Sequence, residues 1–431
     1  MKILHITPSY KPSYIYGGPI ASVSMLCESI RLLSFDSSQD NVNGKAKLEL
    51  QVLTTTANGK AELELKVGKP ILVDGVVVNY FKRWTKDHSH FSPGLLWDLR
   101  KKISQFKNPL PSISPGESPR VKGEQEPPRL IGNPPKEANK LVIHIHAWWN
   151  LVSVLSCLVA KWYNIPVVLS PRGMLNFHTY STGNKTLKKI IHHLIGKKLL
   201  KYCAIHATTN KEKTEIVDFI NANNIIVISN LVSLGKSNIK FDQEKQCNQK
   251  FKIIFLSRIN RIKGLELLFD ALSDVNFDYR LTIAGTGDEN YIKSLKLKAE
   301  SLKLGERIKW IGQVSNDEKF SMMAYHDLLV LPSYNENFAN VVVESLSVGT
   351  PVLVSKNVGL ADYVKANELG WVCSLKPKDI AEKINLAYNH KLKRETIKRN
   401  APILIKNDFD DEVLVRSYIE LYDRVLRLRS E

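Results

Sequence analysis

The sequence predicts an α/β protein made of two doubly wound parallel sheets that face each other across a cleft. Its 431 residues, 43% of them hydrophobic, exceed the roughly 250 to 300 residues at which a single core stops growing. Short apolar runs alternate with segments of helical periodicity in both halves, as in strands joined by crossover helices. A polar, turn-rich stretch at residues 234–249 separates the halves and is the expected linker.

Residues 1–235 are predicted to form the first domain. Strands are expected at 2–7, 48–56, 76–81, 141–148 and 166–171, with helices at 22–33 and 152–163. The alternation breaks between Asn108 and Pro135, where eight prolines stand among Ser, Gly and Glu. Such a segment cannot bury enough apolar surface to order itself, so an exposed or disordered insertion is predicted at about residues 108–139.

Residues 236–408 are predicted to form the second domain. Its strands are expected at 252–257, 279–285, 308–312 and 327–333, with helices at 265–272 and 290–302. Apolar residues recur at helical spacing over residues 409–431. We therefore expect a last helix that packs back toward the first domain.

The termini, apolar runs and cysteines indicate a cytoplasmic protein. The first apolar run ends at Pro8, so it reads as a strand rather than a signal peptide. The longest apolar stretch stops at Lys161, well short of the roughly 20 residues of a membrane span. Five cysteines lie scattered without a CxxC pair, which argues against a disulfide framework and a zinc site.

A net charge of +18 predicts an anionic partner, and no acidic residue occurs between Glu137 and Glu212. The segment 185–201 is basic with an apolar helical face and could lie on an anionic membrane surface, although such a helix can equally pack into its own domain. A nucleic-acid binder is the rival class, but the sequence has no recognised motif for it and no basic stripe interleaved with aromatic residues.

Three strand ends in the second domain carry residues suited to an anion. Arg258 and Lys263 follow the first strand, and Gly285 and Gly287 follow the next, where glycine permits close backbone approach. The segment NENFAN follows the last predicted strand. Ligands of doubly wound sheets bind outside the strand carboxyl ends. Each feature alone could be a surface cation or a plain turn, but together they predict an anion site.

A short helix is predicted to begin directly after that last loop. It spans residues 340–348 and is stopped by Gly349 and Pro351. The amides of Phe338, Ala339 and Asn340 would then lie at its positive end, where a phosphate binds favourably.

Two glutamates, Glu336 and Glu344, flank this helix start. Glu344 lies within the first turns and is placed to hold a pair of ribose hydroxyls, while Glu336 faces the group attached to the phosphate. The alternative for each alone is a local ion pair or an exposed side chain. With the phosphate site between them, they predict binding of a nucleotide diphosphate linked to a sugar.

The runs SRINRIKG, AGTGDE and PSYNENFANVVVESLSVGTPVLVS resemble the donor domain of retaining two-domain glycosyltransferases of family 4. The runs HITPSYKPSYIYGGPIASV, HIHAWWN and SPRGML resemble the acceptor domain of the same family, so the likeness covers most of the chain. It implies the GT-B fold of two Rossmann-like domains, retention of anomeric configuration, and proton transfer to a phosphate oxygen of the donor.

The resemblance also implies roles for individual residues. Arg258 and Lys263 would bind the donor diphosphate and stabilise its charge as it leaves. Glu336 would contact sugar hydroxyls, Glu344 would hold the ribose, and Val314 would meet the base through its backbone. No metal is expected, because no Asp-x-Asp motif follows a strand and the two cations could replace a divalent ion.

The chain departs from the family pattern in two places. Asn337-Phe338-Ala339, which are assigned to the donor-binding residues, stand where the family commonly has Gly-Phe-Gly. A side chain at 337 or 339 would narrow the sugar pocket or demand a different backbone. Arg172 stands where some members have histidine, and it is expected to bind a phosphate or carboxylate of the acceptor.

Further residues of the first domain are assigned to the cleft. Gly17 and Gly18 would let their loop approach the donor phosphate or the acceptor, with a plain turn as the alternative. His144 and His146 are expected to face opposite sides of one strand. His146, nearer the strand end, is the chosen acceptor-side group, and a satisfied core histidine is its alternative.

The sequence therefore predicts a metal-independent retaining hexosyltransferase. It would use a nucleotide diphosphate sugar and a glycan or lipid-linked acceptor in cell-envelope or exopolysaccharide synthesis, at or near the inner face of the plasma membrane. An epimerase or hydrolase of sugar nucleotides on the same fold, or a non-catalytic sensor, are the alternatives, because fold does not fix function.

Overall fold

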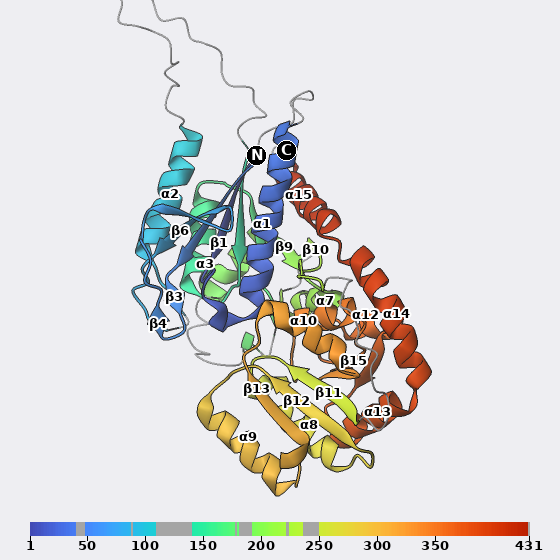
Figure 1. The fold of residues 1–431 in the computed structure, drawn as a ribbon. Coiled ribbons are helices and arrows are strands. Elements are labelled where there is room, and N and C mark those ends of the chain that lie inside the picture. The colour runs from blue at the N-terminus through green and yellow to red at the C-terminus, as the bar shows by residue number, and fades with distance from the viewer. Residues whose placement is uncertain are drawn as a thin grey trace, which may run out of the picture.

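The computed structural model of the chain describes residues 1–39, 48–87, 89–108, 140–176, 179–180, 192–220, 224–235 and 250–429 (Figure 1). The insertion predicted at 108–139 lies outside these residues except for Asn108, as do residues 185–191 of the predicted basic helix.

The described part of the first domain forms an eight-stranded sheet in the order β10-β9-β8-β7-β1-β2-β6-β5. The strands are β1 (Lys2–Thr7), β2 (Glu49–Thr55), β5 (Pro70–Val73), β6 (Val76–Phe81), β7 (Leu141–His146), β8 (Val167–Ser170), β9 (Ala204–Ala207) and β10 (Ile225–Val227). A small hairpin pairs β3 (Ala57–Asn58) with β4 (Ala61–Glu62). All neighbours in the large sheet are parallel except β5, which runs antiparallel to β6 at the edge.

Helices cover both faces of this sheet. They are α1 (Gly18–Gln39), α2 (Pro93–Lys107), α3 (Leu151–Trp162), α6 (Lys197–Tyr202) and α7 (Asn210–Ile220), with short helical turns η1 (Tyr14–Tyr16) and η2 (His192–Gly196). The core on one face joins α2, α3, α6 and α7, and the core on the other face contains α1. Successive side chains of a strand point to opposite faces of the sheet and so alternate between the two cores. Ile3 packs toward α1, and Leu4 packs toward α2 and α3.

The second domain has a six-stranded, wholly parallel sheet in the order β13-β12-β11-β14-β15-β16. The strands are β11 (Phe251–Leu256), β12 (Tyr279–Ala284), β13 (Ile308–Gly312), β14 (Leu328–Leu331), β15 (Val352–Ser355) and β16 (Gly370–Cys373). Helices are α8 (Leu265–Ser273), α9 (Glu289–Ser301), α10 (Asn316–Tyr325), α11 (Asn340–Ser347), α12 (Ala361–Ala366), α13 (Pro377–Asn389) and α14 (Lys391–Asp408), with turns η3 (Arg261–Lys263) and η4 (Gly305–Arg307).

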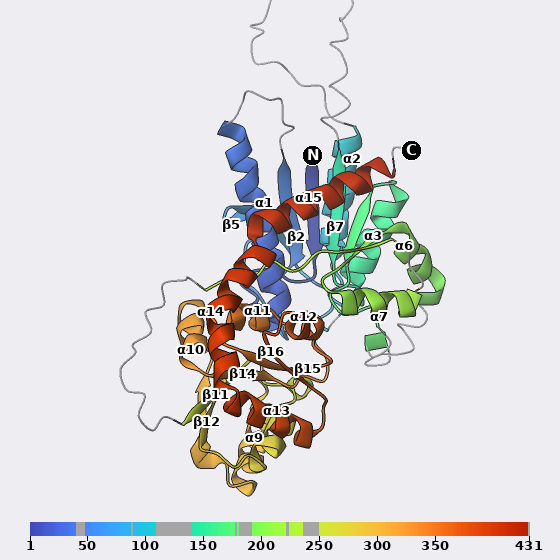
Figure 2. The same cartoon turned by 90° about the vertical axis from the view of Figure 1, so that its right-hand side faces the viewer.

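The last helix, α15 (Asp411–Arg427), leaves the second domain and lies across the sheet of the first (Figure 2). Asp410 caps it by accepting a hydrogen bond from the amide of Val413 at 3.1 Å. Its buried residues recur at helical spacing and join the core that contains α1: Leu414, Val415, Tyr418, Leu421, Tyr422 and Val425. The described chain thus passes from the core of the first domain at Leu231 to that of the second at Val232, and it returns to the first with α15.

The predicted fold class of two doubly wound domains is confirmed. The predicted boundaries at 235 and 408 stay predictions, since residues 236–249 lie outside the described part. Sequence reasoning missed β5, β9, β10, β15 and β16, which have only three or four residues each and so show too little periodicity to recognise. No described helix is long and apolar enough to cross a membrane.

Candidate active site

The strand orders place a topological switch point in each domain. In the second sheet β11 and β14 are neighbours whose outgoing connections lead to opposite sides, and in the first sheet β1 and β7 are the corresponding pair. Crevices at the carboxyl ends of such strands are the usual ligand sites of doubly wound folds. The predicted residues Arg258 and Lys263 follow β11, and the loop of Glu336 follows β14.

The two switch points meet directly. A Cβ atom added to Gly17 would lie 3.0 Å from Nε of Arg258, and Nη1 of Arg258 donates to the carbonyl of Ile15 at 3.4 Å. Gly17 has φ 69°, a left-handed backbone that favours glycine. The absence of a side chain at Gly17 therefore leaves room for Arg258 of the other domain. Arg258 is still exposed, so a ligand can reach it.

The N-terminus of α11 has no capping side chain at its N-cap position. Ala339 is its N-cap residue, and no side chain caps the first-turn amides. The structure starts the helix at Asn340, as predicted, and ends it at Ser347, one residue before the predicted end. Gly18, at the start of α1, faces the same place, since a Cβ there would lie 4.0 Å from Nδ2 of Asn340.

Both predicted glutamates are engaged in ion pairs. Glu336 pairs with Lys263, and these side chains are 21% and 12% exposed. Glu344 pairs with Lys319 at 2.7 Å, with side chains 13% and 12% exposed. Sequence reasoning missed Lys319, whose position is set by the Ser315–Glu318 capping box at the start of α10. The capping box could have been predicted from the Ser-x-x-Glu pattern of residues 315–318.

The glycines after β12 serve the packing of two loops. A Cβ on Gly285 would lie 1.9 Å from the carbonyl oxygen of Ser257, and one on Gly287 would lie 1.9 Å from that of Ile259. The backbone at these glycines therefore does approach another group closely, as predicted, but that group is the backbone of the loop that carries Arg258. Val314 is half-buried in the connection between β13 and α10.

The residues at 337 and 339, where the chain departs from the family pattern, have a left-handed backbone at Ala339 and a contact with the first domain at Asn337. Ala339 adopts φ 72° and ψ 74°, a left-handed conformation that costs a non-glycine residue about 1 kcal/mol. The side chain of Asn337 turns toward the first domain, where Nδ2 donates to Oγ1 of Thr208 at 2.8 Å and to Glu212 at 3.1 Å. Glycine, which the family commonly has at this position, would adopt this conformation without that cost.

Asn340 makes a second polar bridge between the domains. Its Nδ2 donates to Oγ of Ser22 on α1 at 2.9 Å, and its Oδ1 accepts from Asn230 at 3.3 Å. Asn230 in turn accepts from Nη1 of Arg172 at 2.7 Å. Arg172 is half-buried with φ 52°, and its guanidinium also lies 3.5 Å from Nδ1 of His146, so its predicted contact with the acceptor stays a prediction.

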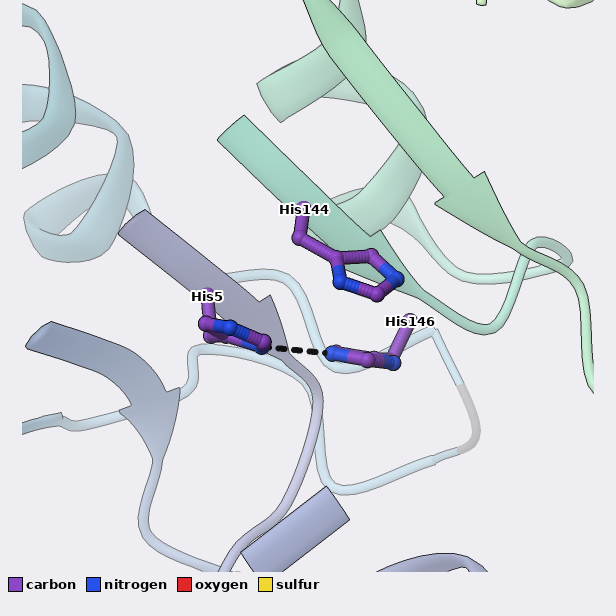
Figure 3. A group of neighbouring side chains, drawn as sticks. All are labelled: His5, His144 and His146. Carbon is purple, nitrogen blue, oxygen red and sulfur yellow. Dashed lines mark hydrogen bonds between the residues drawn. The ribbon is translucent and has the colours of Figure 1, made fainter. Parts of the chain in front are cut away.

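The expected opposite orientation of His144 and His146 is wrong. Their ring centroids lie 4.1 Å apart, because residues two apart on a strand share one face of the sheet. His5 of β1 joins them, and its Nδ1 lies 2.9 Å from Nε2 of His146 (Figure 3). His146 is 1% exposed, so it forms part of a buried cluster, which was the alternative left open for it.

Hydrogen bonds extend this histidine cluster to α15. His144 bonds through Nδ1 to the hydroxyl of Tyr422 at 2.8 Å and through Nε2 to Ser170 at 2.7 Å. Ser170 also bonds to His206 at 2.6 Å. Burial lowers the pKa of His5 and of His206 to about 3, with a smaller effect from the Arg172 charge on each, so both rings are neutral near pH 7.

Nitrogens of His5, His144 and His146 lie within 4.8 Å of one another, close enough to hold a metal ion. Two observations favour a hydrogen-bonded cluster instead. Both nitrogens of His144 already have partners in Tyr422 and Ser170. The Arg172 guanidinium lies 3.5 Å from His146, and its charge opposes a second cation in a buried setting.

A cavity of about 900 Å³ opens between the domains, and its lining includes Ile262 and Asn335, which precede Lys263 and Glu336 in the sequence. The first domain lines it with α7 residues that include Lys211 and Glu215, and the second with Arg261, Tyr334 and Asn335 among others. Its walls carry both signs of charge, aromatic surface and amide groups, which suit a hydroxyl-rich molecule of some size.

Residues 236–403 match the family model described as glycosyl transferases group 1. An uncharacterized glycosyltransferase of Methanocaldococcus jannaschii, MJ1607, is 25% identical over 249 residues, which are 54% of this chain and 63% of the relative. The alignment thus spans less than two thirds of that relative. A Campylobacter jejuni relative, N,N'-diacetylbacillosaminyl-diphospho-undecaprenol alpha-1,3-N-acetylgalactosaminyltransferase, is 23% identical over 63% of this chain and 74% of its own length.

Solved structures share the whole fold at low identity. Anabaena Alr3699/HepE, in complex with UDP and glucose, superposes with a TM-score of 0.65 at 18% identity, over 98% of this chain and all of the other. Sucrose-phosphate synthase from Thermosynechococcus elongatus gives 0.68 at 16%, over 99% of this chain and all of the other. The chain therefore shares the two-domain fold of these structures, and its residues 236–403 are similar to the group 1 glycosyltransferases.

Proposed function

We propose that the protein is a retaining glycosyltransferase of family 4 that moves a hexose from a nucleotide diphosphate sugar to a glycan or lipid-linked acceptor. The observation that carries this proposal is the convergence of Arg258, Lys263 and the uncapped N-terminus of α11 at the switch point of the second domain. Two fixed cations and a helix dipole directed at one place suit a diphosphate.

The same groups suit the chemistry of glycosyl transfer. Cleavage of a glycosyl phosphate bond develops negative charge on the leaving diphosphate, and fixed cations and amides stabilise it most effectively where they need not reorganise. In the proposed reaction Arg258 and Lys263 bind that charge. The acceptor attacks from the face that the diphosphate leaves, and a phosphate oxygen takes its proton. The reaction as proposed needs no metal ion.

Both glutamates would accept hydrogen bonds from the donor, and Glu336 would first be released from its ion pair with Lys263. When a diphosphate shares Lys263, the Glu336 carboxylate is free to accept hydrogen bonds from sugar hydroxyls. Glu344, held near the helix start by Lys319 at 2.7 Å, would accept from the ribose hydroxyls, and Val314 would meet the base.

The acceptor would enter through the cavity between the domains. Two relatives support a polysaccharide or lipid-linked acceptor: the Campylobacter jejuni enzyme by its name, and CapM of Staphylococcus aureus, a capsular polysaccharide biosynthesis glycosyltransferase, 25% identical over 53% of this chain. We propose a role in polysaccharide or envelope synthesis on the cytoplasmic side of a membrane.

Membrane contact through residues 185–201 stays a prediction. In the described part of this segment Leu199 and Leu200 are buried in the first domain, whereas Leu194 is 69% exposed. Lys197, Lys198 and Lys201 are exposed and would supply attraction to anionic lipid.

The proposal is tested by incubating the protein with UDP-glucose, UDP-N-acetylglucosamine and GDP-mannose, each with and without a panel of glycan and lipid-linked acceptors, in EDTA. We expect acceptor-dependent release of one nucleotide diphosphate and a product whose anomeric configuration, read by NMR, matches the donor. Inverted configuration would contradict the retaining mechanism. Nucleotide release without acceptor would indicate a hydrolase, an altered donor sugar an epimerase, and tight binding without any turnover a sensor.

A further inference from the structure

A buried carboxylate lies where the two domains touch. Glu212, in the first turn of α7, is 2% exposed. Its oxygens accept four hydrogen bonds: from the amides of Gly173 at 2.6 Å and Thr208 at 2.7 Å, from the Thr208 hydroxyl at 2.8 Å, and from Nδ2 of Asn337 at 3.1 Å. The first domain supplies three of these donors, and the second domain supplies the fourth.

Asn337 is held at several points by this contact. Its Nδ2 also donates to Thr208 at 2.8 Å, and its carbonyl accepts from Thr209 at 3.4 Å. A Cβ on Gly173 would lie 3.0 Å from Cβ of Asn337, and one on Gly359 would lie 1.8 Å from its carbonyl oxygen. Both glycines thus pack closely against residue 337, whose Oδ1 is buried and has no hydrogen-bond partner among the described residues.

The chemistry of Glu212 also fixes which way the amide points. A carboxylate only accepts hydrogen bonds, so the Nδ2 end of Asn337 must face it. A glycine at position 337, as in the family pattern, would supply no such donor. The carboxylate of Glu212 would then be one hydrogen bond short in a buried setting, which is unfavourable.

Both ends of this contact adjoin residues of the proposed active site. Asn337 directly follows Glu336, and Gly173 directly follows Arg172. The backbone of Glu336 is otherwise tied within its own domain, donating to Asn357 at 3.2 Å and accepting from Gly359 at 2.8 Å. Glu212 therefore links the residue after Glu336 to the residue after Arg172 across the cleft.

We propose that Asn337 and Glu212 form a positioning pair, which fixes Glu336 and Arg172 relative to each other when the two domains close. Neither member of the pair is assigned contact with the reacting atoms. The inference rests on the proposed function, because that function gives Glu336 its contact with the donor sugar. It assigns to Asn337, which departs from the family pattern, the role of holding the two domains in the closed arrangement.

The test compares Asn337→Gly and Asn337→Asp with the full-length wild type. The glycine variant removes the link, and we expect turnover to fall about 10- to 100-fold, the scale of loss for a misplaced catalytic group. Nucleotide diphosphate affinity should not change, since Arg258 and the α11 amides are untouched. The aspartate variant sets a second carboxylate against Glu212, so its turnover should fall further.

A double-mutant cycle separates this pairing from a general structural effect. If the residues act through each other, Glu212→Gln combined with Asn337→Gly should lower turnover no further than the more damaging single change. Asn367→Gly, at an exposed residue after α12, is the matched control and should behave as wild type. Losses that multiply in the double variant, or wild-type turnover in Asn337→Gly, would overturn the proposal.

Small-angle scattering measures closure without any substrate. The Asn337→Asp variant should have a larger radius of gyration than wild type, and equal radii would also overturn the proposal. Failure of the proposed function has a different signature: the wild type would then bind no nucleotide diphosphate and transfer no sugar, while the scattering comparison would still decide the role of the pair.

Discussion

The carboxyl edges of the two sheets face the same cleft but are built from opposite kinds of side chain. At the second edge stand the exposed Arg258 and two partly exposed ion pairs, Lys263–Glu336 and Lys319–Glu344. At the first edge a cluster of buried, neutral histidines is joined by hydrogen bonds to Ser170 and to tyrosines of α15, with the half-buried Arg172 beside it.

The difference shows how one topology can serve two purposes. Charges that a ligand can reach at the second edge are available for binding and for catalysis. The buried rings of the first edge are shielded by α15, whose Tyr418 and Tyr422 bond to His206 at 3.2 Å and to His144 at 2.8 Å. We infer that the first edge chiefly holds the C-terminal helix and supports the cleft wall that Arg172 joins.

The largest expected effect tests the second edge. Lys263→Ala removes a cation from the proposed diphosphate site and leaves Glu336 without its ion-pair partner. Turnover should fall by about 10²- to 10³-fold, as when one fixed group that stabilises transition-state charge is removed. Steady-state transfer kinetics measure this loss. Lys383→Ala, at a surface ion pair on α13, is the control. If it lowered turnover as much as Lys263→Ala, the loss could not be assigned to the second edge.

The pH dependence of stability tests the first edge. Burial holds the pKa of His5 and His206 at about 3 in the folded protein, against about 6.5 when unfolded. The unfolded state therefore binds more protons between these values. Stability is fully present above about pH 6.5 and falls as the pH is lowered toward 3. From pH 7.5 to 5.5 each histidine should cost about 1.4 kcal/mol.

Urea-induced unfolding at the two pH values measures this cost. His206→Gln should make the dependence shallower, whereas His390→Gln, at an exposed residue, should leave it as in wild type. Equal stability of the wild type at pH 7.5 and 5.5 would show that the cluster is charged or open to solvent.

The smallest effect sharpens the contrast between the edges. Tyr422→Phe removes the hydroxyl that bonds to Nδ1 of His144 at 2.8 Å and leaves a buried polar atom without a partner. Unfolding free energy should drop by about 1 to 3 kcal/mol, with nucleotide affinity unchanged. Tyr325→Phe, at a residue 64% exposed, is the control. Weakened nucleotide binding in Tyr422→Phe would mean that the first edge also shapes the donor site.

The contrast between the two edges also explains why features of the second edge could be predicted from the sequence. Arg258 follows β11, Gly285 follows β12, and α11 begins at Asn340 after β14. The residue types that suit an anion site can be recognised at each of these strand ends from a short stretch of sequence. The glutamate spacing and the stop at Gly349 placed α11 within one residue. Local signals of this kind are enough to locate a helix start and the cations beside it.

The first edge required contacts between distant segments. His5, His144 and His206 come from three strands, and Tyr422 lies 278 residues beyond its partner His144. No periodicity joins such residues, so the cluster could not be predicted. The orientation of Asn337 was hidden for the same reason, because its partner Glu212 belongs to the other domain. The error over His144 and His146 came from misapplying the strand period, which was available from the sequence.

The most direct test of the proposed donor site is calorimetric titration of UDP, GDP and ADP, without metal, into the wild type and into Arg258→Ala and Glu344→Ala. Arg280→Ala, at an exposed residue of β12, serves as the control. We expect one nucleotide diphosphate to bind to the wild type and to Arg280→Ala, and binding to be lost in the other two variants. Binding of none of the three to the folded wild type, or equal binding to every variant, would contradict a donor site at the carboxyl edge of the second sheet.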